Sequence, residues 1–199
     1  MASKGNSTLN TLFSDETFTL KNGDKIPLEG HTPQFFQDLT HIIQMWQDHI
    51  TVPDAHGHST APSDLLGEEE MEYVLSHMEH DLEHLTRVEI MGTSVPKEDI
   101  KKGEPIHFNK PLKAFSRHIE QTKDYASFMF DSDDELVVFR TNNRVGHFNI
   151  TRWTDYAVNE GESWVNTESF KVKDIHKEKW FRTHWSENKE YTVTIVDIE

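Results

Sequence analysis

The histidines are the residues whose types and spacing first suggest chemistry. Five of the thirteen histidines fall within one 29-residue segment, and an aspartate lies among them. The residues concerned are His56, His58, His77, His80, Asp81 and His84. If the chain after residue 67 is helical, His80 and His84 are one turn apart and could share a metal ion through neutral imidazoles. His77 and Asp81 have the same spacing.

These donors predict a site for one divalent metal ion, either Zn, Fe or Mn. The loop that carries His56 and His58 could fold back and supply a third ligand, which would leave an open position for hydrolysis. The helix has no HExxH motif, so the carboxylate that serves such enzymes as general base is not at its expected place. The alternative is that these histidines lie on a solvated, carboxylate-rich flank of the helix and bind nothing. We therefore expect no resident cofactor, with a divalent metal as the open alternative.

The same segment is strongly acidic. Residues 54–90 contain ten aspartates and glutamates and a single base, Arg87, so their net charge is −9 when histidine is neutral. Protonation of the five histidines in mild acid would bring this charge to −4. Because nearby carboxylates favour the protonated imidazole, a structural response to pH is a third interpretation of these residues.

Aromatic side chains concentrate in the second half of the chain. The candidates for a flat platform on which sugar rings stack are Trp153, Tyr156, Trp164, Trp180 and Trp185. Indole rings also bury large areas in cores and protein interfaces, which is the other interpretation. The sequence contains no glycine-rich phosphate loop, dinucleotide fingerprint or GxSxG nucleophile motif, and its motifs match no family known to us.

The composition limits the partners that the chain can have. Lys and Arg number 20 against 35 Asp and Glu, which gives a net charge of −15. A phosphate backbone is bound by clustered bases, so we expect no nucleic-acid partner. The absence of cysteine excludes disulfides, thiolate metal sites and cysteine nucleophiles. No segment resembles a signal peptide or a membrane span, so we expect no membrane contact and a location inside the cell or within a virion assembly.

The first half of the chain predicts a hairpin and two helices. Asn22-Gly23 between two short alternating segments favours a β-hairpin within residues 17–28. Apolar residues at three- and four-residue steps predict an amphipathic helix over residues 33–50. A second apolar stripe predicts another helix from about residue 64 or 67 to residue 91. Two such helices joined by one loop are expected to pack antiparallel.

After residue 112 the hydrophobic period shifts toward two, which is typical of strands. The predicted strands are 125–130, 135–140, 144–151, 164–172, 179–185 and 191–196. Their short, turn-forming separators favour an antiparallel meander, sandwich or small barrel. The expected fold class is therefore α+β, with an N-terminal β-hairpin, two antiparallel amphipathic helices and a C-terminal antiparallel β-sheet.

These elements suggest a polar arm plus hairpin (1–30), a helical hairpin (31–95) and an antiparallel β domain (96–199), the last two forming one compact unit. No catalytic set is recognisable, and the arm, the exposed hairpin edge and the aromatic β domain are suited to contacts with other subunits. The sequence thus favours a non-enzymatic structural or assembly protein, such as a capsid, neck or tail component of a virion, that binds protein subunits as a homo- or hetero-oligomer. A metal-dependent hydrolase and a carbohydrate-binding β domain are the alternatives.

Overall fold

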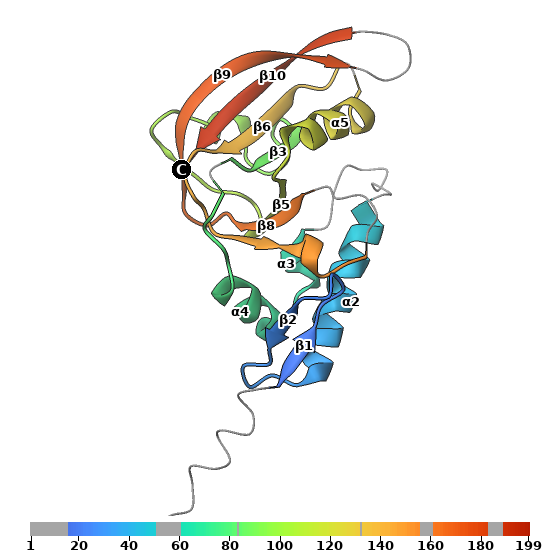
Figure 1. Cartoon of the computed structure of the whole chain (residues 1–199). Coiled ribbons are helices and arrows are strands. Elements are labelled where there is room, and N and C mark those ends of the chain that lie inside the picture. Colours follow the sequence, from blue (N-terminus) through green and yellow to red (C-terminus); the bar gives the residue numbers. More distant parts are fainter. Residues whose placement is uncertain (1–15, 51–60, 83, 132, 156–160, 183–188) are drawn as a thin grey trace, which may run out of the picture.

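The computed structural model describes residues 16–50, 61–82, 84–131, 133–155, 161–182 and 189–199. The helices are α2 (Pro33–Ile50), α3 (Pro62–Leu65), α4 (Glu68–Ser76) and α5 (Ile119–Met129), with short 3-10 helices at Lys97–Asp99 and Ile150–Arg152. The strands are β1 (Thr17–Thr19), β2 (Lys25–Pro27), β3 (Thr86–Ile90), β4 (Pro105–Ile106), β5 (Leu112–Ser116), β6 (Leu136–Thr141), β7 (His147–Asn149), β8 (Glu162–Asn166), β9 (Phe170–Arg182) and β10 (Lys189–Ile198). The hairpin, α2, α3 and α4 lie at one end of the molecule, and the long strands of a large sheet lie at the other with α5 beside them (Figure 1).

The predicted hairpin is present as β1 and β2, which pair antiparallel. Residues 20–24 form the loop between them, and Gly23 adopts a φ of 90° that favours glycine. Arg152 donates from Nε to Asp24 Oδ2 at 3.1 Å, which ties this loop to the β half of the chain.

The helix α2 follows its sequence signals closely. Pro33 is its first residue, and the Thr32 hydroxyl accepts a hydrogen bond from the Phe35 backbone N–H at 3.2 Å as an N-cap. Its apolar stripe, with Leu39 and Ile43 fully buried, enters one core cluster together with the hairpin, α4 and parts of β5, β7 and β8. Burial of that stripe holds the helical end against the sheet.

The second predicted helix is much shorter than its apolar stripe indicates. α4 ends at Ser76, and residues 86–90 form the strand β3 instead of a helical turn. Val88 pairs with Val138 of β6 and Ile90 with Leu136, so strand pairing in the middle of a sheet outweighs the local helical pattern. The prediction of a helix continuing to residue 91 was wrong.

The large sheet has the strand order β4-β9-β10-β6-β3-β5-β8-β7. β10 runs parallel to β6, and the other strand pairs are antiparallel. Because neighbouring strands come from distant parts of the chain, the sheet is not the predicted meander. The α+β fold class, with an N-terminal hairpin, helices and a C-terminal mostly antiparallel sheet, is confirmed.

One predicted strand is a helix. Residues 125–130 belong largely to α5, where Thr122 and Ala126, four residues apart, are buried on one face. The Thr122 hydroxyl lies 2.6 Å from that of Thr86 on β3, so α5 packs on this strand. Packing of this face against β3 therefore favours a helix over a strand in this segment.

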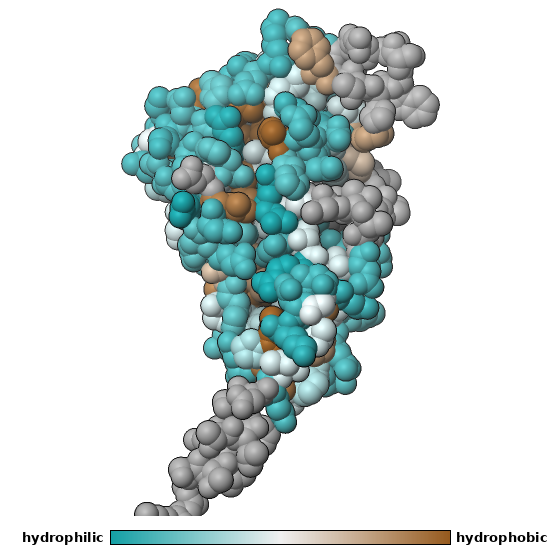
Figure 2. Space-filling model, viewed as in Figure 1, coloured by the Kyte–Doolittle hydropathy of each residue, from teal (hydrophilic) through white to brown (hydrophobic). Residues whose placement is uncertain are grey.

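Alternating residues of the central strands enter two different cores. Val137 and Phe139 of β6 belong to one cluster, whereas Leu136 and Val138 belong to a second one. Successive side chains of a strand point to opposite faces, so these cores lie on the two faces of the sheet. The outer surface is mainly hydrophilic on the side shown in Figure 2, and no helix among the residues described above is long and apolar enough to cross a membrane.

Truncation of the helical core should destabilise the protein strongly. Leu39 is fully buried, so Leu39→Ala leaves a cavity, and we expect a loss of about 2–5 kcal/mol in the free energy of unfolding. Leu75 on α4 keeps 40% of its surface exposed, and Leu75→Ala should cost less than about 1 kcal/mol. Urea unfolding of both variants tests this, and equal losses would contradict the packing described.

Candidate functional site

Within the large sheet, the neighbouring strands β3 and β5 diverge from each other. They are joined by the single residue pair Thr86↔Ser116, whereas each of them pairs along its full length with its other neighbour. Because the strands are antiparallel, both run away from this pair in the same spatial direction, β3 toward Ile90 and β5 toward Leu112. They form the two arms of a V. We call this region, with the side chains of both arms, the split.

Arg87 bridges the split immediately beyond the last backbone pair. Its Nη1 donates to the carbonyl oxygen of Ala114 on β5 at 2.9 Å, and its Nε donates to Glu89 Oε2 at 3.0 Å. A partly buried carbonyl that faces away from the remaining neighbour strand needs another donor, and the guanidinium supplies one. Only 17% of the Arg87 side chain is exposed.

Glu89 provides the negative charge of the split. Its carboxylate is almost fully buried and accepts hydrogen bonds from the Ser94 backbone N–H at 3.1 Å and the Ser94 hydroxyl at 2.7 Å. Together with the bond from Arg87, these contacts satisfy a buried charge in the way that proteins require. Arg87 and Glu89 therefore neutralise each other.

Lys113 of β5 is the second cation of the split, and it has no such partner. The residue is 5% exposed, and its Nζ makes no hydrogen bond or ion pair within the described part of the chain. Burial lowers the pKa of Lys113 to about 8, and the Arg87 charge acts in the same direction, while Glu89 opposes it. Near neutral pH the split thus holds a largely buried, protonated lysine whose ammonium group has no counter-ion in direct contact among the described residues.

A further ion pair lies near the split, beside α3. Lys110 Nζ lies 2.5 Å from Asp64 Oδ1. Burial alone would raise the pKa of Asp64, but the hydrogen bonds from Lys110 and from the Ala61 backbone hold it below its usual value. Lys110 also lines a hollow of about 340 Å³ whose walls include His107, Phe108, Thr167 and Glu168.

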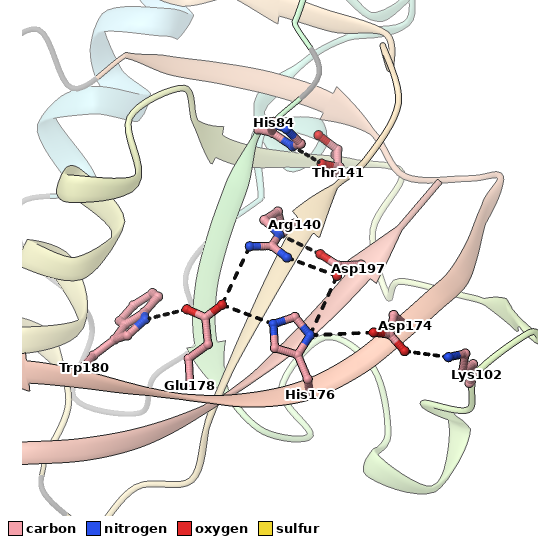
Figure 3. A network of polar contacts seen from close by, with 9 residues as sticks. All are labelled: His84, Lys102, Arg140, Thr141, Asp174, His176, Glu178, Trp180 and Asp197. Carbon is pink, nitrogen blue, oxygen red and sulfur yellow. Dashed lines mark hydrogen bonds and ion pairs between the residues drawn. The ribbon is translucent and has the colours of Figure 1, made fainter.

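A second polar network occupies the opposite face of β6, β9 and β10 (Figure 3). Arg140 binds Asp197 through two hydrogen bonds, Nε to Oδ1 at 2.6 Å and Nη2 to Oδ2 at 3.1 Å. These bonds raise the pKa of Arg140. Glu178 lies between His176 Nε2 at 3.1 Å and Trp180 Nε1 at 3.2 Å. This network is built from long-range strand pairing and shares no residue with the split.

The predicted histidine ridge is not a helix face. Because α4 ends at Ser76, the four-residue spacing no longer places the donors side by side. His77 is the C-cap residue of α4, and its ring stacks on Tyr73 with 4.0 Å between ring centroids. Its Nε2 lies 2.6 Å from Glu29 Oε2, so it links α4 to the segment after the hairpin.

The other predicted histidine ligands are also dispersed. His80 is exposed, with its ring near Gly146. His84 Nδ1 lies 3.0 Å from the carbonyl oxygen of Thr141 at the end of β6. His56 and His58 lie outside the described residues. Among the described residues, the structure thus does not bring His77, His80 and His84 together as metal ligands. A metal site that includes His56 or His58 stays a prediction.

Asp81 does meet other donors, although not the predicted ones. Glu79, Asp81 and His147 each offer a ligand atom within 4.8 Å of the others. However, His147 Nε2 is engaged by Asp81 Oδ1 at 2.6 Å, and its Nδ1 lies 3.1 Å from the Ser163 hydroxyl. The bond from His147 holds the pKa of Asp81 below its usual value. Because His147 and Ser163 are buried, this chain of hydrogen bonds braces β7 and β8 and exposes no nucleophile.

The described tryptophans of the predicted sugar platform are buried. Trp153, Trp164 and Trp180 are each at most 4% exposed and belong to the core clusters. Tyr156 and Trp185 lie outside the described residues. For the described aromatic residues, the core interpretation is the one that the structure supports.

The sequence reasoning missed the residues of the split. Arg87 stood out only as the single base among residues 54–90. Lys113 interrupts the apolar run Leu112–Phe115, which is a signal of a buried charge that a strand assignment there could have revealed. Neither signal shows that the two residues are neighbours.

Comparison with known proteins gives similarity in structure but not in sequence. No protein-family model matches the chain, and no curated protein is significantly similar to it. Vis toxin, an ADP-ribosyltransferase from Vibrio splendidus, is similar with a TM-score of 0.44 and 14% identity, covering 84% of this chain and 74% of that one. Plx2a, an ADP-ribosyltransferase toxin from Paenibacillus larvae, has a TM-score of 0.45 and 8% identity, covering 84% and 87%. Exoenzyme S from Pseudomonas aeruginosa, bound to Carba-NAD, has a TM-score of 0.45 and 10% identity, covering 84% and 74%.

These findings correct the function expected from the sequence. The named structures are of ADP-ribosyltransferases and an exoenzyme, and none of the three is a virion component. The prediction of a non-enzymatic structural or assembly protein, with a role in a capsid, neck or tail, is therefore wrong. The expectation that the chain binds other protein subunits stays a prediction.

Removal of the Lys113 charge should change how stability depends on pH. The folded lysine releases its proton near pH 8, whereas the unfolded lysine keeps it to about pH 10.5, so the unfolded state binds more protons between these values. The free energy of unfolding should therefore rise from pH 8 to 10.5 by up to about 3 kcal/mol in the wild type. Lys113→Met should lack this rise, and Lys97→Met, at an exposed lysine, should keep it. Urea unfolding at several pH values measures both, and equal slopes in wild type and Lys113→Met would contradict the burial of this charge.

Proposed function

We propose that the chain is an enzyme that binds the diphosphate of a nicotinamide dinucleotide at the split and transfers its ADP-ribose. The observation that carries the anion site is Lys113, a largely buried lysine whose ammonium group makes no hydrogen bond among the described residues. A buried charge without a counter-ion is costly, and a bound anion would offset that cost. The proposal thus gives a role to a charged group that the described part of the chain leaves without a direct partner.

Arg87 supports a phosphate ligand in particular. Two of its nitrogens, Nε and Nη1, are fixed by Glu89 and Ala114, which orients the guanidinium plane. Its Nη2 makes no hydrogen bond to any residue that the structure describes, so it remains available to an incoming oxygen. Guanidinium groups match phosphate oxygens in geometry and charge. With Glu89 counted, the three charged groups of the split sum to +1 in a chain of net charge −15.

The similar structures suggest which dinucleotide to test first. Vis toxin and Plx2a are ADP-ribosyltransferases, and exoenzyme S is bound to Carba-NAD. In ADP-ribose transfer, the bond between the ribose C1′ and nicotinamide breaks, nicotinamide leaves, and the acceptor forms a bond to C1′ and loses a proton. NAD would be a substrate here, which is compatible with the expectation of no resident cofactor.

Lys113→Met should weaken the binding of NAD and of inorganic pyrophosphate. Loss of one charge-assisted contact to a phosphate should raise the dissociation constant about 10- to 100-fold. Titration calorimetry on the full chain measures both dissociation constants. A separate assay measures the release of nicotinamide from NAD by the wild type. Methionine fills similar space and removes a desolvated charge, so the variant should remain folded.

Lys97→Met, which removes an exposed lysine paired with Glu135, is the matched control and should bind NAD as the wild type does. Equal affinities of wild type and Lys113→Met for both ligands would overturn the anion site. Binding of NAD without any release of nicotinamide, with or without a candidate acceptor protein, would overturn the transfer reaction but leave the anion site intact.

A further inference from the structure

The network on the other face of the sheet has the features of a metal site. Asp174, His176 and Glu178 alternate along β9 and point to the same face, where Asp197 of β10 joins them (Figure 3). The register between β9 and β10 shifts at Asp197/Ile198, immediately beside this group. Two carboxylates and an imidazole from paired strands thus converge on one point.

The separations of the donor atoms leave room for an ion between them. His176 Nδ1 lies 3.9 Å from Asp174 Oδ2 and 3.8 Å from Asp197 Oδ2. Both distances are too long for hydrogen bonds. All three residues offer ligand atoms within 4.8 Å of one another. With two edges of 3.9 and 3.8 Å and a third of at most 4.8 Å, an ion equidistant from the three atoms would lie roughly 2.2–2.5 Å from each, which is near or somewhat beyond the Zn–N and Zn–O bond lengths.

The surrounding contacts orient each donor toward that centre. Glu178 Oε1 lies 3.1 Å from His176 Nε2, which favours the tautomer with a proton on Nε2 and leaves the lone pair of Nδ1 facing the two aspartates. This carboxylate–imidazole pair is the arrangement that accompanies histidine ligands of metals in proteins. Trp180 Nε1 in turn donates to Glu178 Oε2 at 3.2 Å and fixes its position.

The two aspartates are held in a similar way. Arg140 binds both oxygens of Asp197, whose side chain is only 9% exposed. Lys102 Nζ donates to Asp174 Oδ1 at 2.7 Å, and the Asp174 oxygen Oδ2 is the one nearest His176 Nδ1. The donors are therefore positioned before any ion arrives.

The geometry points to a binding site for one divalent transition-metal ion formed by Asp174, His176 and Asp197. The mixed nitrogen and oxygen donors suit Zn²⁺ or Mn²⁺. Three carboxylates (Glu178 included) and two cations, Arg140 and Lys102, leave a net charge of −1 when His176 is neutral, so a dication is attracted electrostatically. The site lies on the face of the sheet opposite the split and is independent of the proposed transfer reaction.

The full chain is first treated with a chelator and then titrated with Zn²⁺, and calorimetry measures the binding at this site. We expect one Zn²⁺ to bind to the wild type, and His176→Ala to weaken that binding at least 100-fold. His84→Ala removes an exposed histidine outside the cluster and is the matched control, which should bind as the wild type does. Because the chain has thirteen histidines, this comparison separates the proposed site from adventitious binding.

Two further variants keep the test decisive if His176→Ala misfolds. Asp174→Asn removes one ligand oxygen at an exposed position and should weaken Zn²⁺ binding at least 10-fold. Glu178→Gln leaves the ligands in place but weakens the orientation of His176, and an effect of about 10- to 100-fold is expected. If none of the three variants differs from His84→Ala, or if the wild type binds no Zn²⁺, the network is a set of ion pairs around His176 and the metal site is refuted.

Discussion

The bond from Arg87 to the Ala114 carbonyl holds the two halves of the sheet together at the point where backbone pairing ends. Beyond Thr86↔Ser116 the strands β3 and β5 diverge, and their facing backbone groups would be unsatisfied without a side-chain donor. A guanidinium can reach across the opening, but its charge must then be buried. Glu89 accepts a hydrogen bond from Arg87 and balances its charge, and the Ser94 hydroxyl donates to Glu89. The polar contacts of Arg87, Glu89 and Ser94 thus lie inside the protein because β3 and β5 diverge there.

The alternation of side chains along β3, β6 and β10 explains why the split and the network around His176 lie on opposite faces of the sheet. Arg87 pairs with Phe139, so it shares a face with that residue, whereas Arg140, one position later, lies on the other face. A shift of one residue in this register would exchange the faces and bury the wrong charges. Each network is therefore a consequence of a single register, and the hydrophobic residues between them keep that register fixed.

Local signals predicted the parts of the fold that local interactions determine. Asn22-Gly23 predicted the hairpin, and Thr32 and Pro33 predicted the start of α2, because turn and cap geometry depends on neighbouring residues. The signals failed at β3 and at α5, where apolar spacing fits both a helix and a strand. There the choice depends on partners about 35 to 50 residues away, such as Val138 for β3, which periodicity cannot identify.

The candidate site was harder to predict because its residues become neighbours only through the sheet. The histidine hypothesis needed a helix that continues through His84, but α4 ends at Ser76. Arg87 and Lys113 become neighbours because β3 and β5 pair at Thr86↔Ser116. A sequence shows that Lys113 stands in an apolar run, but not that no carboxylate of the described residues contacts it. That is the physical reason to expect a ligand. Arg87 and Glu89 bind each other, whereas Glu89 and Asp64 act on the ammonium group of Lys113 only through space, and burial still lowers its pKa.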